Sequence, residues 1–267
     1  APGELRRQEA AQLRKDRRGQ GVAEHAAVTA MRRQHTGAQA VERAFDSGLD
    51  LRCVLAAAEL RPDEADLVER LRAAGVRVRR SSVNDRRRMS VSTPAPRLLG
   101  VSGPDPDAPL EVWLRDDPAP AWLLVDVAYP GNAGYAVRCA EVSGAAGIAL
   151  AVDYDRAARQ KALRASMHAE RFLPVSFVSA PEVLERARAA GRRILAVEDC
   201  GDRAPWQEDL TRPALFVVGG EEKGLSAEIL AGCDAVLRLP MQGFIPSYNL
   251  QAAMAMVAGE ALRQRGA

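Results

Sequence analysis

A regular alternation of apolar runs and helical segments in residues 121–267 constrains the fold more than any other feature of this sequence. Segments with helical patterning separate the apolar runs, and a long helix from Tyr248 to Arg265 is expected to end the pattern. Near-continuous apolar strands that alternate with helices indicate a parallel sheet covered on both faces. We therefore predict an α/β fold. The expected strands are 122–127, 147–152, 175–178, 193–197, 214–219 and 235–239, and the expected helices between them are 135–143, 157–166 and 181–190.

The residues that precede this region predict a smaller α/β module. Helical and strand-like segments alternate within 100 residues, at 39–47, 51–56, 63–74 and 76–78. Pro and Asp are concentrated between 103 and 120, which is typical of a linker. We therefore expect a first domain over 1–105 with an extra helical segment at 1–35, a linker over 106–120, and a second domain over 121–267.

The composition argues against several classes of protein. The chain contains no run of about eighteen apolar residues, so we expect no membrane-spanning helix. The first twenty residues are charged and lack the apolar core of a secretory signal, so we expect a cytoplasmic location. The four Cys residues lie far apart and only 3 His residues occur, so we expect neither a disulfide framework nor a metal site.

The charges are distributed unevenly along the chain. Residues 1–100 carry 20 Lys and Arg against 13 Asp and Glu, whereas the remaining residues carry 17 against 22. A basic part joined to an acidic part favours a module that binds a polyanion. A solvated, Arg-rich surface explains the charge equally well, so the choice depends on the motifs.

The first motif is Asn132-Ala133-Gly134-Tyr135-Ala136-Val137-Arg138, which follows a strand and a Tyr-Pro-Gly turn. Asn132 stands where a helix N-cap is expected, and Gly134 permits the close approach of another backbone segment. Arg138 lies farther along the helix and can reach back towards the loop. A capped helix with an exposed Arg is the simpler interpretation of the same residues.

The other two motifs follow strands nearer the end of the chain. Glycines at the carboxyl end of a strand form a loop that can approach a ligand, and two successive Glu residues there favour a purine or a ribose over a phosphate. In the last motif, Ser247 is a candidate N-cap, and Asn249 is a mediocre helix former in an expected first turn. The motifs are Gly219-Gly220-Glu221-Glu222-Lys223-Gly224 and Leu239-Pro240-Met241-Gln242-Gly243, the latter continuing to Ser247-Tyr248-Asn249.

In their order and spacing, the three motifs resemble those of the SpoU/TrmH-type RNA 2′-O-ribose methyltransferases of the SPOUT superfamily. The family pattern is N-x-G-x-x-x-R, then G-x-E-x-x-G, then I/L-P-M-x-G-x-x-x-S-L-N. This chain departs from it at Tyr248, where Leu is usual, and at Gly220, where a small polar residue is common. Met167 and His168 stand where the family tends to have small residues. The matching residues are Asn132, Gly134, Arg138, Gly219, Glu221, Gly224, Pro240, Met241, Gly243, Ser247 and Asn249.

The resemblance implies an enzyme that moves a methyl group from S-adenosylmethionine to a ribose hydroxyl of a structured RNA, with ribosomal RNA favoured over transfer RNA. It implies a SPOUT domain with a deep trefoil knot, a homodimer that pairs through this domain, and a ribosomal-protein-like RNA-binding domain, which residues 39–101 resemble more loosely. No membrane partner and no metal are expected.

The resemblance also implies the roles of individual residues. Arg138 is the implied catalytic group. Because a guanidinium rarely loses its proton, a phosphate clamp that lowers the pKa of the hydroxyl is the alternative to a general base. The implied polar support comes from Asn132, Glu221, Ser247 and Asn249. The implied cofactor-binding residues are Val218, Gly219, Gly220, Leu239, Pro240, Met241, Tyr248 and Asn249.

Arginines between residues 77 and 88 are the candidate RNA contacts. Lys and Arg side chains that neutralise phosphates supply much of the affinity for RNA, and the interleaved Ser and Asn residues add hydrogen bonding. A solvated face is the other interpretation of this stretch. The candidates are Arg77, Arg79, Arg80, Arg86, Arg87 and Arg88.

Other functions remain open from the sequence. One is a transfer RNA ribose methyltransferase, and another is a non-catalytic RNA-binding protein with a degenerate methyltransferase fold. A third is a knotted enzyme that methylates a base, although the N-x-G-x-x-x-R motif favours the ribose.

Overall fold

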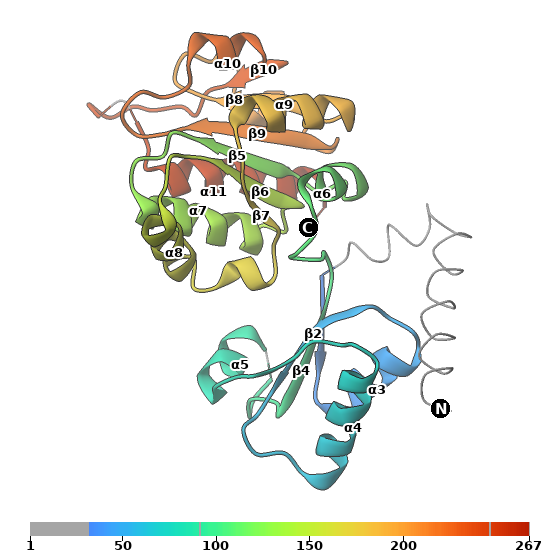
Figure 1. Cartoon of the computed structure of the whole chain (residues 1–267). Coiled ribbons are helices and arrows are strands. Elements are labelled where there is room, and N and C mark those ends of the chain that lie inside the picture. The colour runs from blue at the N-terminus through green and yellow to red at the C-terminus, as the bar shows by residue number, and fades with distance from the viewer. Residues whose placement is uncertain (1–31, 91, 246, 267) are drawn as a thin grey trace. The chain divides into compact units, whose positions relative to one another are not determined.

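The computed structural model describes residues 32–90, 92–245 and 247–266 (Figure 1). The chain divides into two compact units, residues 1–103 and 104–267. The extra helical segment expected at 1–35 lies mostly outside the described residues. At its described end the expectation is wrong, because Arg33–Thr36 form a strand that pairs with Leu99–Ser102.

The first unit is built on a mixed four-stranded sheet in the order β1-β4-β2-β3. Strands β2 and β3 run parallel, whereas β4 is antiparallel to both of its neighbours. Val41, Val54 and Leu71 are fully buried or nearly so in the core cluster that joins α3 and α4 to the sheet. The elements are β1 (Arg33–Thr36), α3 (Ala38–Asp46), β2 (Leu51–Ala56), α4 (Pro62–Ala73), β3 (Val78–Arg80), α5 (Val83–Met89) and β4 (Leu98–Ser102).

The strand expected at 76–78 begins two residues later than predicted. Val76 N–H donates to the Leu71 carbonyl, and Gly75 adopts a positive φ of 82°, so these residues close the end of α4 instead of starting the strand. As a result, Arg79 and Arg80 lie on β3.

The second unit is built on a six-stranded parallel sheet in the order β10-β8-β9-β5-β6-β7. The predicted parallel α/β sheet is therefore confirmed. The elements are α6 (Leu110–Asp116), β5 (Ala121–Val125), α7 (Pro130–Val142), β6 (Gly147–Ala151), α8 (Arg156–Ala165), η1 (Ala169–Arg171), β7 (Val175–Phe177), α9 (Ala180–Ala189), β8 (Arg193–Val197), η2 (Pro205–Gln207), β9 (Ala214–Gly219), α10 (Ala227–Ala231), β10 (Ala235–Leu237) and α11 (Leu250–Gln264).

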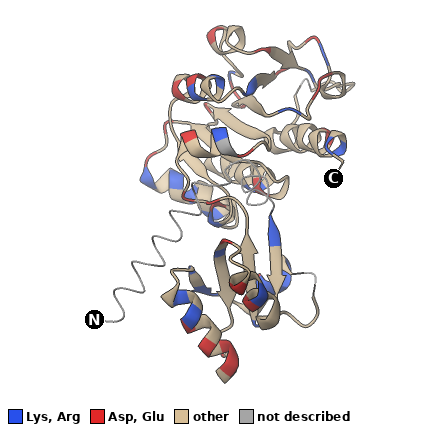
Figure 2. Cartoon of the chain, turned by 90° about the vertical axis from the view of Figure 1, so that its right-hand side faces the viewer, with Lys and Arg blue, Asp and Glu red and all other residues tan. Residues whose placement is uncertain are grey.

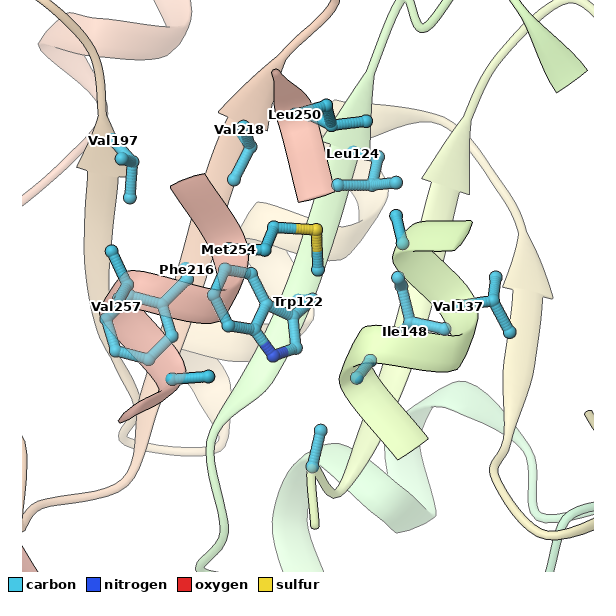
Figure 3. Packing of buried hydrophobic residues seen from close by; sticks show 14 of the residues in the cluster. Trp122, Leu124, Val137, Ile148, Val197, Phe216, Val218, Leu250, Met254 and Val257 are labelled. Atoms are coloured by element: carbon cyan, nitrogen blue, oxygen red, sulfur yellow. The ribbon is translucent and has the colours of Figure 1, made fainter. Parts of the chain in front are cut away.

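Helices cover both faces of this sheet because the side chains of its central strands alternate between two cores. In β5, Trp122 and Leu124 enter one core cluster with residues of α7, α8 and α11, whereas Leu123 enters the other with residues of α6 and α9. Figure 3 shows Trp122 beside Phe216 and Met254 in the first of these clusters, and the two aromatic rings lie 4.9 Å apart between centroids. Burial of both faces of the strands accounts for their nearly continuous apolar sequence.

The segment 106–120, which we expected to be a linker, belongs to the second compact unit. It contains α6, in which Leu110, Trp113 and Leu114 are buried in the second core cluster. The buried guanidinium of Arg192 holds this segment by donating hydrogen bonds to four of its backbone carbonyls and to that of Ala214 in β9. Burial lowers the pKa of Arg192 to about 10. Helix α6 was not predicted from the sequence because it packs through only a few large side chains and is flanked by Pro-rich and Asp-rich residues.

Across the residues that the structure describes, no helix combines the length and apolar character required to cross a bilayer.

Candidate functional site

The first motif lies on α7, which begins earlier than its residue pattern predicts. Tyr129 is the N-cap and Pro130 takes the first helical position, so Asn132 lies inside the first turn and is not the N-cap. This position leaves the side chain of Asn132 available for a contact outside the helix. Its amide Nδ2 donates a hydrogen bond of 2.5 Å to Oε1 of Glu221 in the second motif.

The prediction that Gly134 allows another backbone segment to approach closely is confirmed. A Cβ atom at this position would lie 2.2 Å from the carbonyl oxygen of Ala162 and 2.6 Å from Cβ of Ala165. Gly134 therefore permits the carboxyl end of α8 to pack directly against the backbone of α7. Since residues four apart share one helix face, Arg138 emerges from this same side of α7.

The second motif forms a tight loop after β9. Gly224 has a φ of 61°, and its N–H donates to the carbonyl of Gly220. A Cβ atom at Gly220 would lie 2.0 Å from the carbonyl oxygen of Asp126, so the loop packs backbone to backbone against the end of β5. Glu221 extends this junction, because its Oε2 lies 3.4 Å from the backbone N of Ala128.

The third motif connects β10 to α11, and the predicted start of the last helix is corrected here. Asn249 is the N-cap of a helix that begins at Leu250, although its side chain makes no capping hydrogen bond. Ser247 is exposed and lies before the N-cap, so it does not cap the helix as considered from the sequence. The hydroxyl of Tyr248 donates to the carbonyl of Pro240 at 2.9 Å and so joins the two ends of the loop.

The strand ends that carry these loops lie at one edge of the sheet. Leu237 of β10 pairs with Val197 of β8, which in turn pairs with Val218 of β9. Val218, Leu239 and Leu250 are buried in a single core cluster. The residues that anchor the second and third motifs are therefore packed together, while Pro240, Ser247, Tyr248 and Asn249 remain exposed.

Arg138 lies well along α7, close to the start of α11. It lines a hollow of about 550 Å³ together with Tyr135, Cys139, Val142 and Gln251. Gln251 lies in the first turn of α11, two residues after Asn249, so Arg138 lies near the end of the third motif. Its Nη1 donates to the thioether sulfur of Met167.

A second cavity, of about 620 Å³, contains residues that the sequence analysis missed. It lies where the loops after β5, β6 and β9 meet, and it is rich in carboxylates. The carboxyl ends of parallel strands are the usual ligand edge of an α/β sheet, so the Asp residues just after β5 and β6 carried a usable signal. The missed residues are Asp126, Asp153, Tyr154 and Asp155, whereas Glu222 and Lys223 belong to the second motif.

Tyr154 is a fixed element of this cavity and not an acid–base group. Its hydroxyl donates to the carbonyl of Val127 at 2.6 Å. Burial, reinforced by the negative charge of Glu221, raises the pKa of Tyr154 to about 12. The phenol therefore remains protonated at neutral pH.

The candidate RNA-binding Arg residues of the first unit differ in their exposure to solvent, and the prediction for one of them, Arg86, is wrong. Arg86 is 3% exposed, and its guanidinium donates to the carbonyls of Ser81 and Pro96, so it supports the fold and is not available to RNA. The physical reason is its place on the inner side of α5. Arg77, Arg80, Arg87 and Arg88 are exposed, and Arg79 is half-buried. Figure 2 marks the basic residues of this unit in blue.

No three His, Cys, Asp or Glu side chains gather in a way that suits a metal ion within residues 32–90, 92–245 and 247–266.

The chain is similar to known proteins in sequence and in fold. Residues 121–259 match the model of the SpoU rRNA Methylase family. The chain is 29% identical over 159 residues to the 23S rRNA (guanosine-2′-O-)-methyltransferase RlmB of Pseudomonas syringae pv. tomato. That match covers 59% of this chain and 64% of RlmB, so the chain spans less than two thirds of this relative.

Two solved structures have a similar fold. A structure described as an RNA 2′-O ribose methyltransferase superposes with a TM-score of 0.54 at 27% identity, covering 92% of this chain and 93% of the other. The SpoU methyltransferase AviRb of Streptomyces viridochromogenes, in complex with AdoMet, superposes with a TM-score of 0.54 at 24% identity. The second match covers 88% of this chain and 91% of AviRb, and it shows the shared fold.

Proposed function

Because the chain belongs to the SpoU rRNA Methylase family, we propose that it transfers a methyl group from S-adenosylmethionine to the 2′-hydroxyl of a ribose in RNA. One structural observation carries this proposal. Asn132 and Glu221, which lie in different motifs, form a hydrogen bond, and Arg138 on the same helix as Asn132 lies beside the start of α11. We place the meeting point of the hydroxyl and the methyl donor beside these residues, which lie far apart in the sequence.

The three loops suit S-adenosylmethionine better than a phosphate-bearing cofactor. The Gly219–Gly224 loop packs so closely on its neighbours that no side chain fits at Gly219 or Gly220, and the loop carries two Glu residues that would repel phosphate. When bound, the cofactor supplies an electrophilic methyl group. We assign its binding to Val218, Gly219, Gly220, Leu239, Pro240, Met241, Tyr248 and Asn249.

The reaction needs a hydroxyl that is oriented and partly relieved of its proton. In this proposal the guanidinium of Arg138 donates to the phosphate next to the target ribose and stabilises the developing oxyanion. Asn132 and Glu221 fix the start of α7 against the second loop. The exposed Ser247 hydroxyl and Asn249 amide supply further polar contacts to the ribose.

We assign RNA recognition to the first unit, which carries the excess of basic residues. The proposed phosphate contacts are the arginines that reach solvent on β3, on α5 and just before β3. Ribosomal RNA is the favoured substrate, because the relative RlmB is named for it. The contacts are Arg77, Arg79, Arg80, Arg87 and Arg88.

We further propose a homodimer through the second unit and a trefoil knot at its carboxyl end. Tyr135, Val142 and Met256 expose 51%, 73% and 41% of their surface, and a second copy packed on α7 and α11 would cover such side chains. Sedimentation equilibrium tests the dimer: we expect Val142→Asp to yield monomers, and an unchanged mass would contradict this interface.

Two features of the second unit support the proposed knot. Strand β9 lies between β8 and β5, and the loop after β9 packs on the backbone of Asp126.

The activity is tested by methyl transfer from S-adenosylmethionine carrying a labelled methyl group to ribosomal and transfer RNA. We expect the wild-type chain to label ribosomal RNA and Arg138→Ala to lose turnover while it binds the cofactor normally. Arg186→Ala is the matched control, because Arg186 is also an exposed helical Arg but lies on α9, across the sheet from α7. Cofactor binding with no transfer to any RNA would favour a non-catalytic protein.

A further inference from the structure

The turn that follows α8 has an uncommon backbone conformation. Met167 and His168 have φ values of 56° and 64°, which place two successive residues with a Cβ atom in the left-handed region. This region is unfavourable for residues other than Gly, and such conformations persist only where surrounding contacts enforce them.

Hydrogen bonds of Ser166 and Glu170 hold this turn in place. The hydroxyl of Ser166, which is 1% exposed, donates to the carbonyl of Leu163 at 2.7 Å and accepts from the N–H of Ala169 at 3.2 Å. Glu170 contacts both Ser166 Oγ, at 3.0 Å, and Nδ1 of His168, at 3.1 Å. The backbone of the turn is therefore fixed from several directions.

The fixed turn presents one side chain to Arg138. Met167 is 51% exposed, so burial does not explain its place in the turn, and its sulfur accepts the hydrogen bond from Arg138 Nη1. Gly134, one helical turn before Arg138, lets the end of α8 approach α7 closely enough for this contact. In the N-x-G-x-x-x-R motif, the Gly therefore allows α8 to pack against α7, and the Arg four residues later lies on the same helix face, where it contacts Met167.

We propose that Met167 is a positioning residue for Arg138. The proposal rests on the function proposed above, in which Arg138 contacts the RNA. A thioether is an uncharged, weak acceptor, so it orients one N–H group and leaves the positive charge and the other donors of Arg138 to the substrate. A carboxylate at the same place would orient the guanidinium equally well but would also neutralise it.

Two substitutions of Met167 separate orientation from charge. Met167→Leu keeps the volume and removes the acceptor, so we expect kcat to fall about 2- to 10-fold, with the Kd for S-adenosylmethionine and the Tm unchanged. Met167→Glu pairs with Arg138, so we expect a higher KM for RNA and a salt dependence of RNA binding that is weaker by about one phosphate contact.

Two further variants serve as controls. His168→Gly relieves the left-handed strain without touching the Met167 contact, so we expect wild-type turnover and a higher Tm. In an Arg138→Lys background, which lacks the guanidinium fork, we expect Met167→Leu to have no further effect on kcat.

Wild-type kcat and KM in Met167→Leu would overturn the positioning role. An equal loss of kcat in both backgrounds, accompanied by a lower Tm, would show that Met167 has a structural role, and this result would also overturn the positioning role. Full turnover in Arg138→Ala would instead contradict the proposed function itself.

Discussion

Nδ2 of Asn132 and Oε1 of Glu221 lie 2.5 Å apart although 89 positions separate the two residues in the chain. The bond joins the first turn of α7 to the loop after β9. It brings together two motifs that the sequence could only suggest were neighbours.

The first prediction concerns this bond. We expect Asn132→Ala and Glu221→Ala each to lower kcat about 10-fold, because the start of α7 loses its register against the second loop. The double variant should be no worse than either single one, since both remove the same contact. Because the pair is exposed, the free energy of unfolding should change by at most about 1 kcal/mol. Additive losses of kcat would show that the two residues act independently.

The second prediction concerns the packing of α7 on α8. Gly134→Ala places a Cβ atom against the backbone of Ala162, so we expect the free energy of unfolding to fall by about 1–3 kcal/mol, measured by urea denaturation. Gly131→Ala is the matched control in the same helix, because a Cβ atom there meets nothing within 4 Å. Equal stability of the two variants would mean that the close approach is not needed.

The third prediction separates two adjacent arginines of α5. Arg86→Ala leaves buried carbonyls without a donor, so we expect the free energy of unfolding to fall by about 1–3 kcal/mol. Arg87→Ala should leave stability unchanged and reduce the slope of log affinity for RNA against log salt by about one. If Arg87→Ala alters stability and not the salt slope, this helix is not an RNA contact.

The fourth prediction concerns pH. Burial raises the pKa of Glu208, but hydrogen bonds and charge from Arg193 outweigh burial and hold the pKa below its ordinary value. The carboxylate therefore stabilises the fold above its unfolded pKa of about 4.3, and this stabilisation is lost as the pH falls through the lower pKa of the folded state.

Thermal denaturation between pH 3 and 7 checks this expectation. Glu208→Gln should lower the Tm most near pH 7, and its difference from the wild type should narrow in the acidic part of the range. Asp202→Asn is the control, since Asp202 and Glu208 both pair with Arg203 but the side chain of Asp202 is 77% exposed. A Tm difference between Glu208→Gln and the wild type that is constant across the range would contradict the assigned role of Arg193.

The sequence was most informative where one physical cause dominates. The strands at 193–197 and 214–219 are observed with the predicted bounds, because burial on both faces demands uninterrupted apolar residues. It was least informative where a few side chains decide the structure. Helix α6 packs through three large residues between Pro-rich flanks, and nothing in three successive Arg residues indicates that only the first, Arg86, points inward.

The candidate site shows the same division. Motif spacing indicated Asn132, Gly134 and Glu221, because local turns and close backbone packing impose residue types that can be read along the chain. Met167 carried no such signal, since its contact with Arg138 depends on how α8 ends and on a turn held by Ser166. Residues that act through tertiary contacts become visible only in the structure.

The most direct test of the proposed activity is the position of the transferred methyl group. RNA labelled by the wild-type chain should be digested with alkali, which cleaves every linkage except one that follows a 2′-O-methylated ribose. We predict that the label appears in alkali-resistant dinucleotides and disappears with Arg138→Ala. Label recovered in mononucleotides would place the methyl group on a base and contradict the account.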